Sequence, residues 1–395
     1  MRFPQAEVAV VGLGPAGRAL AHRLLHHGAR VVVADPAPER AWWQTYAAWQ
    51  HQLPDWLDDD VVGAQAGRPV IRAPRPVQLD DRYLVLDSGR LQRSLDISVA
   101  EPLPELLDEA AMSALAPVVV DCRGSHPLPV RRRGRRWREG PTQSAYGVVL
   151  PAELAAGLLE DADSVLMDWR PHDGAASWGP RRPSFCYLVP VPGGGVLAEE
   201  TSLAATPAMD RALLRHRLAV RLRRHGVAAQ EMAAAPTERV HIPLLPAPRP
   251  VVPGPAQVHR FGSAGDQLNP ISGYSVGSSL QQADELARAL LEHRSWPSRS
   301  ADPRRLALAA LDRLGGDATM ELFGAFSRMP SSAQRTVLDP RTSTRPVLAA
   351  MGRQWWTMAP RHRPALVAAT AAGITDLRPR PADRRAGSHS RTGAP

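Results

Sequence analysis

The start of the chain limits the possible folds more than any other stretch. Residues 8–11 (Val-Ala-Val-Val) form a short apolar run typical of a buried parallel strand, and a glycine-rich turn follows directly at residues 12–17. A helical apolar stripe continues to Gly28, a natural helix C-cap, and residues 31–34 predict a second strand that ends at Asp35. This order of strand, turn, helix and strand predicts a Rossmann-like α/β unit.

The glycine turn has the composition of a dinucleotide site. Gly12 permits the tight turn, Gly14 lets the backbone approach a pyrophosphate, and Gly17 allows the helix to pack closely on the strand. Free N–H groups at the helix N-terminus face the phosphates, and an acid at the end of the second strand accepts a hydrogen bond from a ribose hydroxyl. We expect FAD, with NAD as the alternative. The predicted cofactor-binding residues of this unit are Gly12, Gly14, Pro15, Ala16, Gly17 and Asp35.

The composition is that of a globular, basic chain. Its 395 residues are 44% hydrophobic and predict two or three interpenetrating domains. All 48 basic residues are arginine, against 39 acidic ones, and a net charge of +9 permits attraction to anionic membranes or nucleic acid. Cys122 and Cys186 lie in apolar runs and predict buried thiols, with no disulfide framework and no metal site. The sequence shows no secretory signal and no run of about 18 apolar residues, so we expect a cytoplasmic protein.

Further elements follow along the chain. Residues 83–86 and 117–124 predict strands, the second ending in a glycine turn. Short strands at 146–150, 165–169, 185–190 and 195–201 predict an antiparallel substrate-binding sheet. Arginine-rich residues 207–227 and residues 277–293 predict helices. A second glycine-rich turn at residues 261–274 would place backbone N–H groups beside another part of the cofactor; its predicted binding residues are Gly262, Gly265, Gly273 and Tyr274.

Two unusual segments allow more than one interpretation. Residues 41–49 concentrate aromatic side chains, which form either a hydrophobic loop packed on the sheet or the wall of a pocket for an apolar substrate or a cation. The arginine-rich segment 131–138 contains Trp137 and is interpreted as a solvated loop rather than a nucleic-acid site, because no nucleic-acid motif lies nearby.

The predicted fold is a discontinuous FAD-binding Rossmann-like domain with an inserted antiparallel substrate sheet and C-terminal helices. The FAD-binding parts are residues 1–75, 117–145 and 241–295, the substrate parts are 76–116 and 146–240, the helical region is 296–375 and a disordered tail is 376–395.

Several motifs occur in a characteristic order. They are G-L-G-P-A-G at 12–17 with D-P-A-P at 35–38, T-Y-A-A-W at 45–49, V-D-C-R-G at 120–124, M-D-W-R at 167–170, L-A-E-E-T at 197–201, and G-S-A-G at 262–265 with P-I-S-G-Y at 270–274. Over roughly residues 5–290 this ordered set resembles the flavin-dependent lycopene cyclase family.

The resemblance implies a flavoenzyme without net redox chemistry, an intramolecular lyase or isomerase. It implies reduced FAD, a reductant such as an NAD(P)H system, and a linear polyene whose ends close to β-ionone rings after protonation. Such chemistry needs a carboxylic acid kept protonated by burial, and aromatic faces that stabilise a cation. An apolar polyene further implies peripheral contact with the inner face of the cell membrane. Candidate contact surfaces are segment 131–138 and the helix with Trp355 and Trp356, although core packing is the favoured interpretation of these two tryptophans.

The resemblance also implies the site residues. The first acid of the L-x-E-E-T motif corresponds to Glu199, expected to do acid–base work. Its neighbour Glu200 is a second candidate, but adjacent strand residues point to opposite faces, so at most one of them faces the substrate. Asp168 is a weaker candidate that equally suits an ion pair with Arg170. The predicted substrate-pocket residues are Tyr46, Trp49, Trp169 and Tyr187.

Some residues depart from the family pattern. His51 and Gln52 stand where an acidic pair is usual, and Leu197 and Ala198 stand where larger hydrophobic residues are usual. These changes leave open a different carotene or a terpenoid that is not a carotenoid. Two rivals also stay open: a flavin-dependent monooxygenase or halogenase on the same fold, and a catalytically inactive membrane-associated scaffold.

Overall fold

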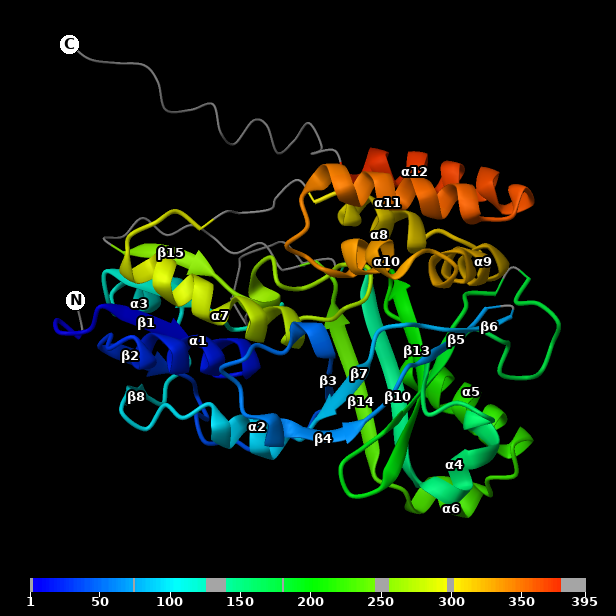
Figure 1. Cartoon of the computed structure of the whole chain (residues 1–395), viewed down its shortest axis with the longest axis horizontal. Helices are drawn as coiled ribbons and strands as arrows, with labels where there is room; N and C mark the ends of the chain where they lie inside the picture. Colours follow the sequence, from blue (N-terminus) through cyan, green and yellow to red (C-terminus); the bar gives the residue numbers. More distant parts are fainter. Residues whose placement is uncertain are drawn as a thin grey trace, which may run out of the picture.

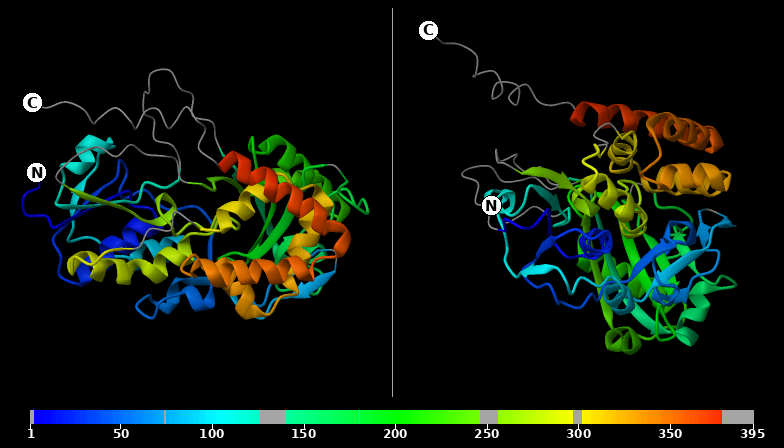
Figure 2. Two further views of the ribbon diagram at one scale, coloured as in Figure 1. Left: turned by 90° about the horizontal axis from the view of Figure 1, so that it is seen from above. Right: turned by 60° about the vertical axis from the view of Figure 1, so that its left-hand side comes forward.

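The computed structural model describes residues 3–73, 75–125, 140–179, 181–245, 256–296 and 302–377 (Figures 1 and 2). The arginine–tryptophan segment 131–138 and the predicted tail from residue 378 onward lie outside these ranges. Figure 1 shows two parts side by side: a parallel sheet with α1 and α7, and a larger sheet between two groups of helices.

The first part is a parallel sheet with the strand order β15-β9-β1-β2-β8. Its strands are β1 (Val8–Val11), β2 (Val31–Ala34), β8 (Glu101–Leu103), β9 (Val118–Asp121) and β15 (Gln257–Arg260). Both faces of this sheet are covered. Val8 and Val10 pack with α1 (Pro15–His26) and α7 (Val276–Leu291), whereas Ala9 and Val11 belong to a second core on the other face, which includes Met112 of α3 (Glu109–Ser113). Burial on both faces explains why β1 and β2 are continuous apolar runs rather than alternating ones.

The second part is a seven-stranded sheet with the order β14-β10-β13-β12-β11-β5-β6. Its neighbouring strands are antiparallel except for the parallel β11–β5 pair. The strands are β5 (Val70–Arg72), β6 (Pro76–Gln78), β10 (Thr142–Pro151), β11 (Val165–Asp168), β12 (Phe185–Pro190), β13 (Gly195–Ala205) and β14 (Thr237–Pro243).

Helices cover both faces of the seven-stranded sheet. One face packs against α4 (Ala152–Leu159), α5 (Arg211–Arg224) and α6 (Ala229–Ala234). The opposite face packs against α8 (Arg304–Leu311), α9 (Gly316–Ser327), α10 (Ser331–Leu338), α11 (Thr344–Thr357) and α12 (Arg363–Leu377). Figure 2 shows these C-terminal helices, yellow to red, lying over the large sheet. Alternate residues of each strand therefore belong to two separate cores.

A small antiparallel sheet, β3-β7-β4, joins the two parts. It consists of β3 (Tyr46–Trp49), β4 (Val62–Gln65) and β7 (Tyr83–Leu86). Leu86 packs in the core of the parallel sheet, whereas Tyr83 packs in the core under the C-terminal helices. The short helix α2 (Ser88–Ser94) follows β7 and is capped by Asp87, which accepts a hydrogen bond from the Arg90 amide.

The predicted fold class is confirmed: a Rossmann-type parallel sheet is combined with an antiparallel sheet and C-terminal helices. The predicted helix at 207–227 is shorter, since α5 spans Arg211–Arg224. The segment boundaries differ because distant strands pair: β8, from the segment assigned to the substrate domain, extends the parallel sheet, and β5, from the first FAD segment, joins the large sheet.

Candidate active site

The first glycine turn forms a close-packed cradle at the ends of β1 and β9. Gly12 has a φ of +96°, and a Cβ there would lie 2.8 Å from the backbone of Cys122. A Cβ on Gly17 would lie 1.9 Å from the Gly12 carbonyl oxygen, whereas one on Gly14 would meet nothing within 4 Å. Pro15 begins α1, and no side chain caps this helix N-terminus. The turn thus offers open space and free N–H groups where a phosphate would bind.

Asp35 closes the other side of this cradle. Its Oδ2 accepts a hydrogen bond from the Leu13 amide at 2.8 Å, and its Oδ1 accepts one from the Ala37 amide at 2.9 Å. Each carboxylate oxygen keeps a further lone pair, so the side chain is fixed in place and can still accept from a ribose hydroxyl.

The second glycine turn packs on the first. A Cβ on Gly262, whose φ is +68°, would lie 2.5 Å from the Ala16 Cβ, and one on Gly265 would lie 2.6 Å from the Arg260 carbonyl oxygen. Gly273 has a φ of +74° and receives the side chain of Gln143, whose buried Oε1 has no hydrogen-bond partner among the described residues. The turn therefore leaves a spare acceptor in its wall.

Asn269 organises the end of this turn. Its Oδ1 accepts hydrogen bonds from the amides of Ile271 and Ser272. Its Nδ2 donates to the carbonyl oxygens of Val337 and Leu338 at 3.0 and 2.8 Å, at the end of α10. One buried side chain thus joins the second glycine turn to the C-terminal helices.

A cavity of about 550 Å³, here called the carboxylate cavity, lies between the second glycine turn and the large sheet. Two glutamates, Glu199 and Glu238, line it together with the residues that the sequence assigned to the pocket or the cofactor. Those assigned residues are Tyr46, Tyr187, Gly273 and Tyr274.

Glu199 is one of the two buried acids of this cavity. Its residue is 8% exposed, and its Oε1 accepts a hydrogen bond from Thr201 Oγ1 at 2.7 Å. Burial, and secondly the charge of Glu238, raise the pKa of Glu199 to about 8, against the opposing effect of the Thr201 hydrogen bond. Glu199 therefore holds a proton at neutral pH and can act as an acid.

Four tyrosines surround the acid. Burial, followed by the charge of Glu238, raises the pKa of Tyr46 to about 12, and burial also raises the pKa values of Tyr83, Tyr187 and Tyr274 well above the usual value. The Tyr187 hydroxyl donates to the Tyr83 hydroxyl at 3.4 Å. These neutral aromatic rings line the cavity, and electron-rich rings can stabilise a cation.

A second cavity, of about 350 Å³ and here called the apolar cavity, lies under the C-terminal helices. Trp49, Met167 and Phe323 line it, and Tyr274 borders both cavities. The Trp49 ring packs 4.9 Å from that of Tyr83, which in turn lies 6.1 Å from Tyr274. Aromatic rings thus lie where the carboxylate cavity and the apolar cavity meet.

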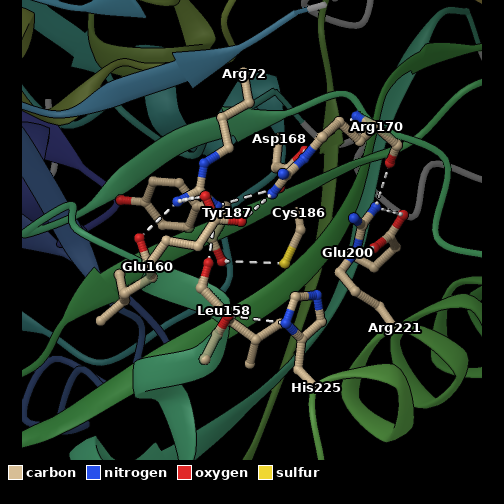
Figure 3. A network of polar contacts seen from close by, with 12 residues as sticks. Arg72, Leu158, Glu160, Asp168, Arg170, Cys186, Tyr187, Glu200, Arg221 and His225 are labelled. Atoms are coloured by element: carbon tan, nitrogen blue, oxygen red, sulfur yellow. Dashed lines mark hydrogen bonds and ion pairs between the residues drawn. The ribbon is translucent and has the colours of Figure 1, made fainter. Parts of the chain in front are cut away.

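The other two predicted acids lie on the opposite face of the sheet, away from both cavities (Figure 3). Glu200 is fully buried, accepts hydrogen bonds from Ser184 Oγ at 2.6 Å and from Arg221 Nε at 3.0 Å, and pairs in register with Cys186. Glu200 therefore anchors the strand to α5 and does not face the substrate chamber.

Asp168 lies in the same cluster. It binds Arg170 Nε at 2.9 Å and Arg72 Nη1 at 3.3 Å. Burial opposes ionisation of Asp168, but the Arg170 hydrogen bond and the nearby arginine charges together hold its pKa below the usual range. The structure thus supports the ion-pair interpretation of Asp168 rather than the catalytic one.

Trp169 also departs from its predicted place. It lines neither cavity and packs in the core, 4.8 Å from the Phe185 ring and stacked 4.9 Å from the Phe323 ring. His51 and Gln52, which depart from the family pattern, line neither cavity either, since Gln52 packs against Gly277 and His51 lies near Asp81.

The sequence model of the family described as lycopene cyclase protein matches residues 7–349. The chain belongs to this family. It is similar to an uncharacterized carotenoid cyclase of Deinococcus radiodurans, with 28% identity over 85% of this chain and 87% of that protein.

Other lycopene cyclase relatives align over less of their length. The lycopene beta cyclase of Synechococcus elongatus is 28% identical over 71% of each protein. The chloroplastic lycopene beta cyclase of Arabidopsis thaliana is 28% identical over 74% of this chain, which spans only 61% of that protein.

Among solved structures, a geranylgeranyl bacteriochlorophyll reductase-like protein from Thermoplasma acidophilum matches with a TM-score of 0.59. The sequences are 15% identical, and the match covers 94% of this chain and 100% of that one. At this identity the likeness shows a shared fold alone.

This lycopene cyclase family member has site residues that motif reasoning missed. Glu238 and Gln143 come from β14 and β10, Tyr83 comes from the small sheet, and Thr201 bonds Glu199. Of these residues, only Thr201 belongs to a motif, as the last residue of L-x-E-E-T. The others come together through pairing between distant strands, which no local sequence pattern predicts.

The C-terminal helices carry an exposed aromatic surface. Trp356 is 68% exposed, so the interpretation that this residue packs in the core is wrong. Arg363 stacks over the rings of Trp355 and Trp356 at 5.0 and 5.1 Å. Among the described helices, none combines the length and hydropathy needed to cross a bilayer.

Proposed function

We propose that this protein is an FAD-dependent cyclase that closes the linear ends of lycopene or a related polyene to β-ionone rings without net redox change. The observation that carries this proposal is Glu199, a buried carboxyl protonated at neutral pH in a cavity beside the second glycine turn. Family membership supports the reaction class.

The residues present fit FAD. The cradle of Gly12, Gly14 and Gly17 has room for a pyrophosphate at an uncapped helix N-terminus, Asp35 has lone pairs for a ribose, and Gln143 Oε1 offers an unpaired acceptor. When bound and reduced by a cellular donor such as NAD(P)H, the flavin supplies an electron-rich ring that stabilises positive charge in the cavity.

Glu199 would start the reaction by donating its proton to the terminal double bond of the polyene. The resulting tertiary cation is attacked by the neighbouring internal double bond. Water would quench such a cation, and the faces of Tyr187 and Tyr274 stabilise it without reacting.

The apolar cavity suits the rest of the polyene. Its lining combines aliphatic and aromatic side chains from the sheet and from α8 to α12. Tyr274 lines both this cavity and the carboxylate cavity, which contains Glu199. Leu348 lines this cavity and is also exposed, so the cavity reaches the surface near α11.

An apolar substrate of this kind would come from a lipid bilayer. Trp356 and Arg363 lie on the same group of helices that encloses the apolar cavity, and such side chains suit the headgroup region. We therefore place peripheral membrane contact at α11 and α12, on the inner face of the cell membrane.

The test is anaerobic incubation of the purified protein, with FAD reduced by dithionite, with lycopene in liposomes, followed by chromatography of the products. Glu199→Gln should lower ring formation more than about 100-fold, whereas Glu153→Gln, the same change at an exposed position of α4, should not. Activity with oxidised FAD, or full activity of Glu199→Gln, would refute the mechanism. Bound FAD with no conversion of lycopene would refute the substrate.

A further inference from the structure

Glu238 lies opposite Glu199 across the floor of the carboxylate cavity. Gly147 of β10 is in register with Glu199 of β13 on one side and with Glu238 of β14 on the other. Cross-strand partners point to the same face, so both carboxyl groups rise from neighbouring strands with only a glycine between them. A Cβ on Gly147 would already lie 3.1 Å from the Glu199 Cβ, so the space between the acids depends on glycine.

The surroundings of the two glutamates differ. Glu238 is 8% exposed, and its two oxygens accept hydrogen bonds from the Thr45 amide at 3.0 Å and from Thr45 Oγ1 at 2.6 Å. These two donors hold both oxygens of the Glu238 carboxyl group in place beside the cavity. Glu199 accepts one hydrogen bond, from Thr201. Neither glutamate forms an ion pair with a basic side chain within the described part of the chain.

Glu199 and Glu238 are the two carboxyl groups in the lining of the carboxylate cavity. Its remaining titratable side chains are the four tyrosines together with Arg239 and His241, which occupy the alternate, more exposed positions of β14. Of the bases that line this chamber, Glu238 is buried in register with Gly147 beside Glu199, whereas the imidazole of His241 is exposed.

We propose that Glu238 is a second catalytic carboxylate, the base that receives the proton lost from the ring. The inference rests on the proposed cyclisation and assigns its last step. Glu199 and Glu238 then form an acid–base pair in which one carboxyl group is neutral and the other is charged.

The step balances as follows. The O–H bond of Glu199 breaks and a C–H bond forms at the terminal alkene carbon, leaving a tertiary cation. The internal π pair forms the ring C–C bond and a new tertiary cation. A C–H bond beside that cation then breaks, its electron pair becomes the ring double bond, and its proton goes to Glu238. Glu199 ends as the anion and Glu238 as the acid, and transfer of one proton back restores the starting pair.

The experiment uses reduced holoenzyme and lycopene liposomes in D₂O, with mass spectrometry of both product and recovered substrate. The wild type should give one deuterium per ring. Glu238→Gln should lower ring formation at least about 100-fold while the recovered linear polyene gains deuterium, because the cation now returns its charge by losing a proton to Glu199. Glu199→Gln should show neither product nor exchange.

Two results would overturn the assignment: ring formation by Glu238→Gln within about threefold of the wild type, or loss of product with no exchange into the substrate. The exposed change Glu153→Gln serves as the control. If Glu238→Gln fails to bind FAD or to fold, Glu238→Asp, which keeps the base, should give folded enzyme that still forms rings, and a folded but inactive Glu238→Asp that shows no exchange would contradict the proposal.

A second measurement needs no turnover. Infrared titration of the Glu199 carboxyl band, identified by its loss in Glu199→Gln, should give a midpoint at lower pH in Glu238→Gln, because the neighbouring anion is gone. An unchanged midpoint would show that the two carboxyl groups do not interact and would end the proposal. If the wild type leaves lycopene unchanged, the proposed substrate fails, and this titration still decides whether the pair exists.

Discussion

Two adjacent glutamates on opposite faces of β13 have opposite electrostatic environments. Glu199 lies above the sheet, on the face that the C-terminal helices cover. Tyrosines surround it, Thr201 donates a hydrogen bond to it, and a second carboxylate is nearby. Glu200 lies below the sheet, fully buried against Arg221 and Ser184. The same side chain, one residue apart, is protonated on one face and ion-paired on the other.

The difference shows what decides the role of a buried acid. Burial disfavours the charged form in both places. Below the sheet, the arginine compensates the charge, and the glutamate becomes an anchor. Above it, no basic side chain among the described residues forms an ion pair with Glu199, so the glutamate keeps its proton and is available for chemistry. The comparison predicts that equal substitutions on the two faces have opposite consequences.

The largest expected effect is on turnover. Glu199→Gln should lower kcat about 10³-fold, because the group that protonates the substrate is lost. Thermal stability should stay equal or rise, since a neutral amide replaces a carboxyl group that was costly to ionise. Steady-state kinetics and melting curves on one preparation check both. A clear drop in the Tm would mean that Glu199 also supports the fold.

The pH dependence of the free energy of unfolding should come mainly from Glu199. The pKa of Glu199 is raised from 4.5 to about 8 in the folded protein, so the folded state holds a proton that the unfolded state releases. The stabilisation is fully present below pH 4.5 and is lost as the pH rises toward 8, with a slope of at most about 1.4 kcal/mol per pH unit. Urea unfolding at several pH values should show a flatter curve for Glu199→Gln.

Activity should follow the same group. Because the acid must be protonated, kcat should fall above a pH of about 8 in the wild type. A profile that stays level well above that pH would show that another group delivers the proton.

On the lower face, Glu200→Gln should cost stability rather than chemistry. The change leaves the Arg221 charge buried without its partner, and we expect a loss of about 3 kcal/mol in the free energy of unfolding. Chemical denaturation measures it, and kcat per folded molecule should change far less than in Glu199→Gln. Equal losses of kcat in the two variants would remove the distinction between the faces.

A smaller effect of the same kind is expected at Asp168. Asp168→Asn should lower the free energy of unfolding by about 2 kcal/mol, because the ion pairs of Asp168 are lost. The loss is smaller than in Glu200→Gln, since the Arg72 guanidinium keeps its hydrogen bonds to the carbonyl oxygens of Leu158 and Leu159. Turnover should remain near that of the wild type. A large fall in kcat with unchanged stability would restore Asp168 as a catalytic candidate.

The smallest effect concerns the glycine between the two acids. In Gly147→Ala the new methyl group would lie 2.9 Å from Leu197 Cδ1 and 3.1 Å from the Glu199 Cβ, so these side chains must shift by a few tenths of an ångström. We expect about a tenfold loss in kcat with FAD binding intact. An unchanged kcat would show that the spacing of the carboxyl groups is not critical.

The sequence predicted the parts of the molecule whose geometry is local. The turn from Gly12 to Gly17 specifies its own conformation, because a side chain at Gly12 would meet the backbone of Cys122 and one at Gly17 would meet the Gly12 carbonyl oxygen. The alternation of strand side chains also predicted that only one of Glu199 and Glu200 could face the substrate. The family resemblance indicated Glu199, and the register places this residue beside Tyr187 and Gly147, on the face that lines the carboxylate cavity.

The remaining features depend on contacts between distant segments. Glu238 reaches the cavity because β14 pairs with β10, nearly a hundred residues earlier in the chain, and no motif surrounds it. Trp169 resembles a pocket residue by type, but Phe323 of α9 fills the space beside it. Trp356 resembles a core residue by type, but its position on α11 leaves it exposed. Residue type alone does not distinguish a wall, a core and a surface.

Asn269 gives the fold a further property. The same carboxamide orders the second glycine turn through its oxygen and holds the end of α10 through its nitrogen. A shift of the end of α10 would therefore alter the contacts that order the turn beside the cofactor cradle. If filling of the apolar cavity shifts α10, thermodynamic linkage requires that the cavity's ligand and the cofactor change each other's affinity by the same factor.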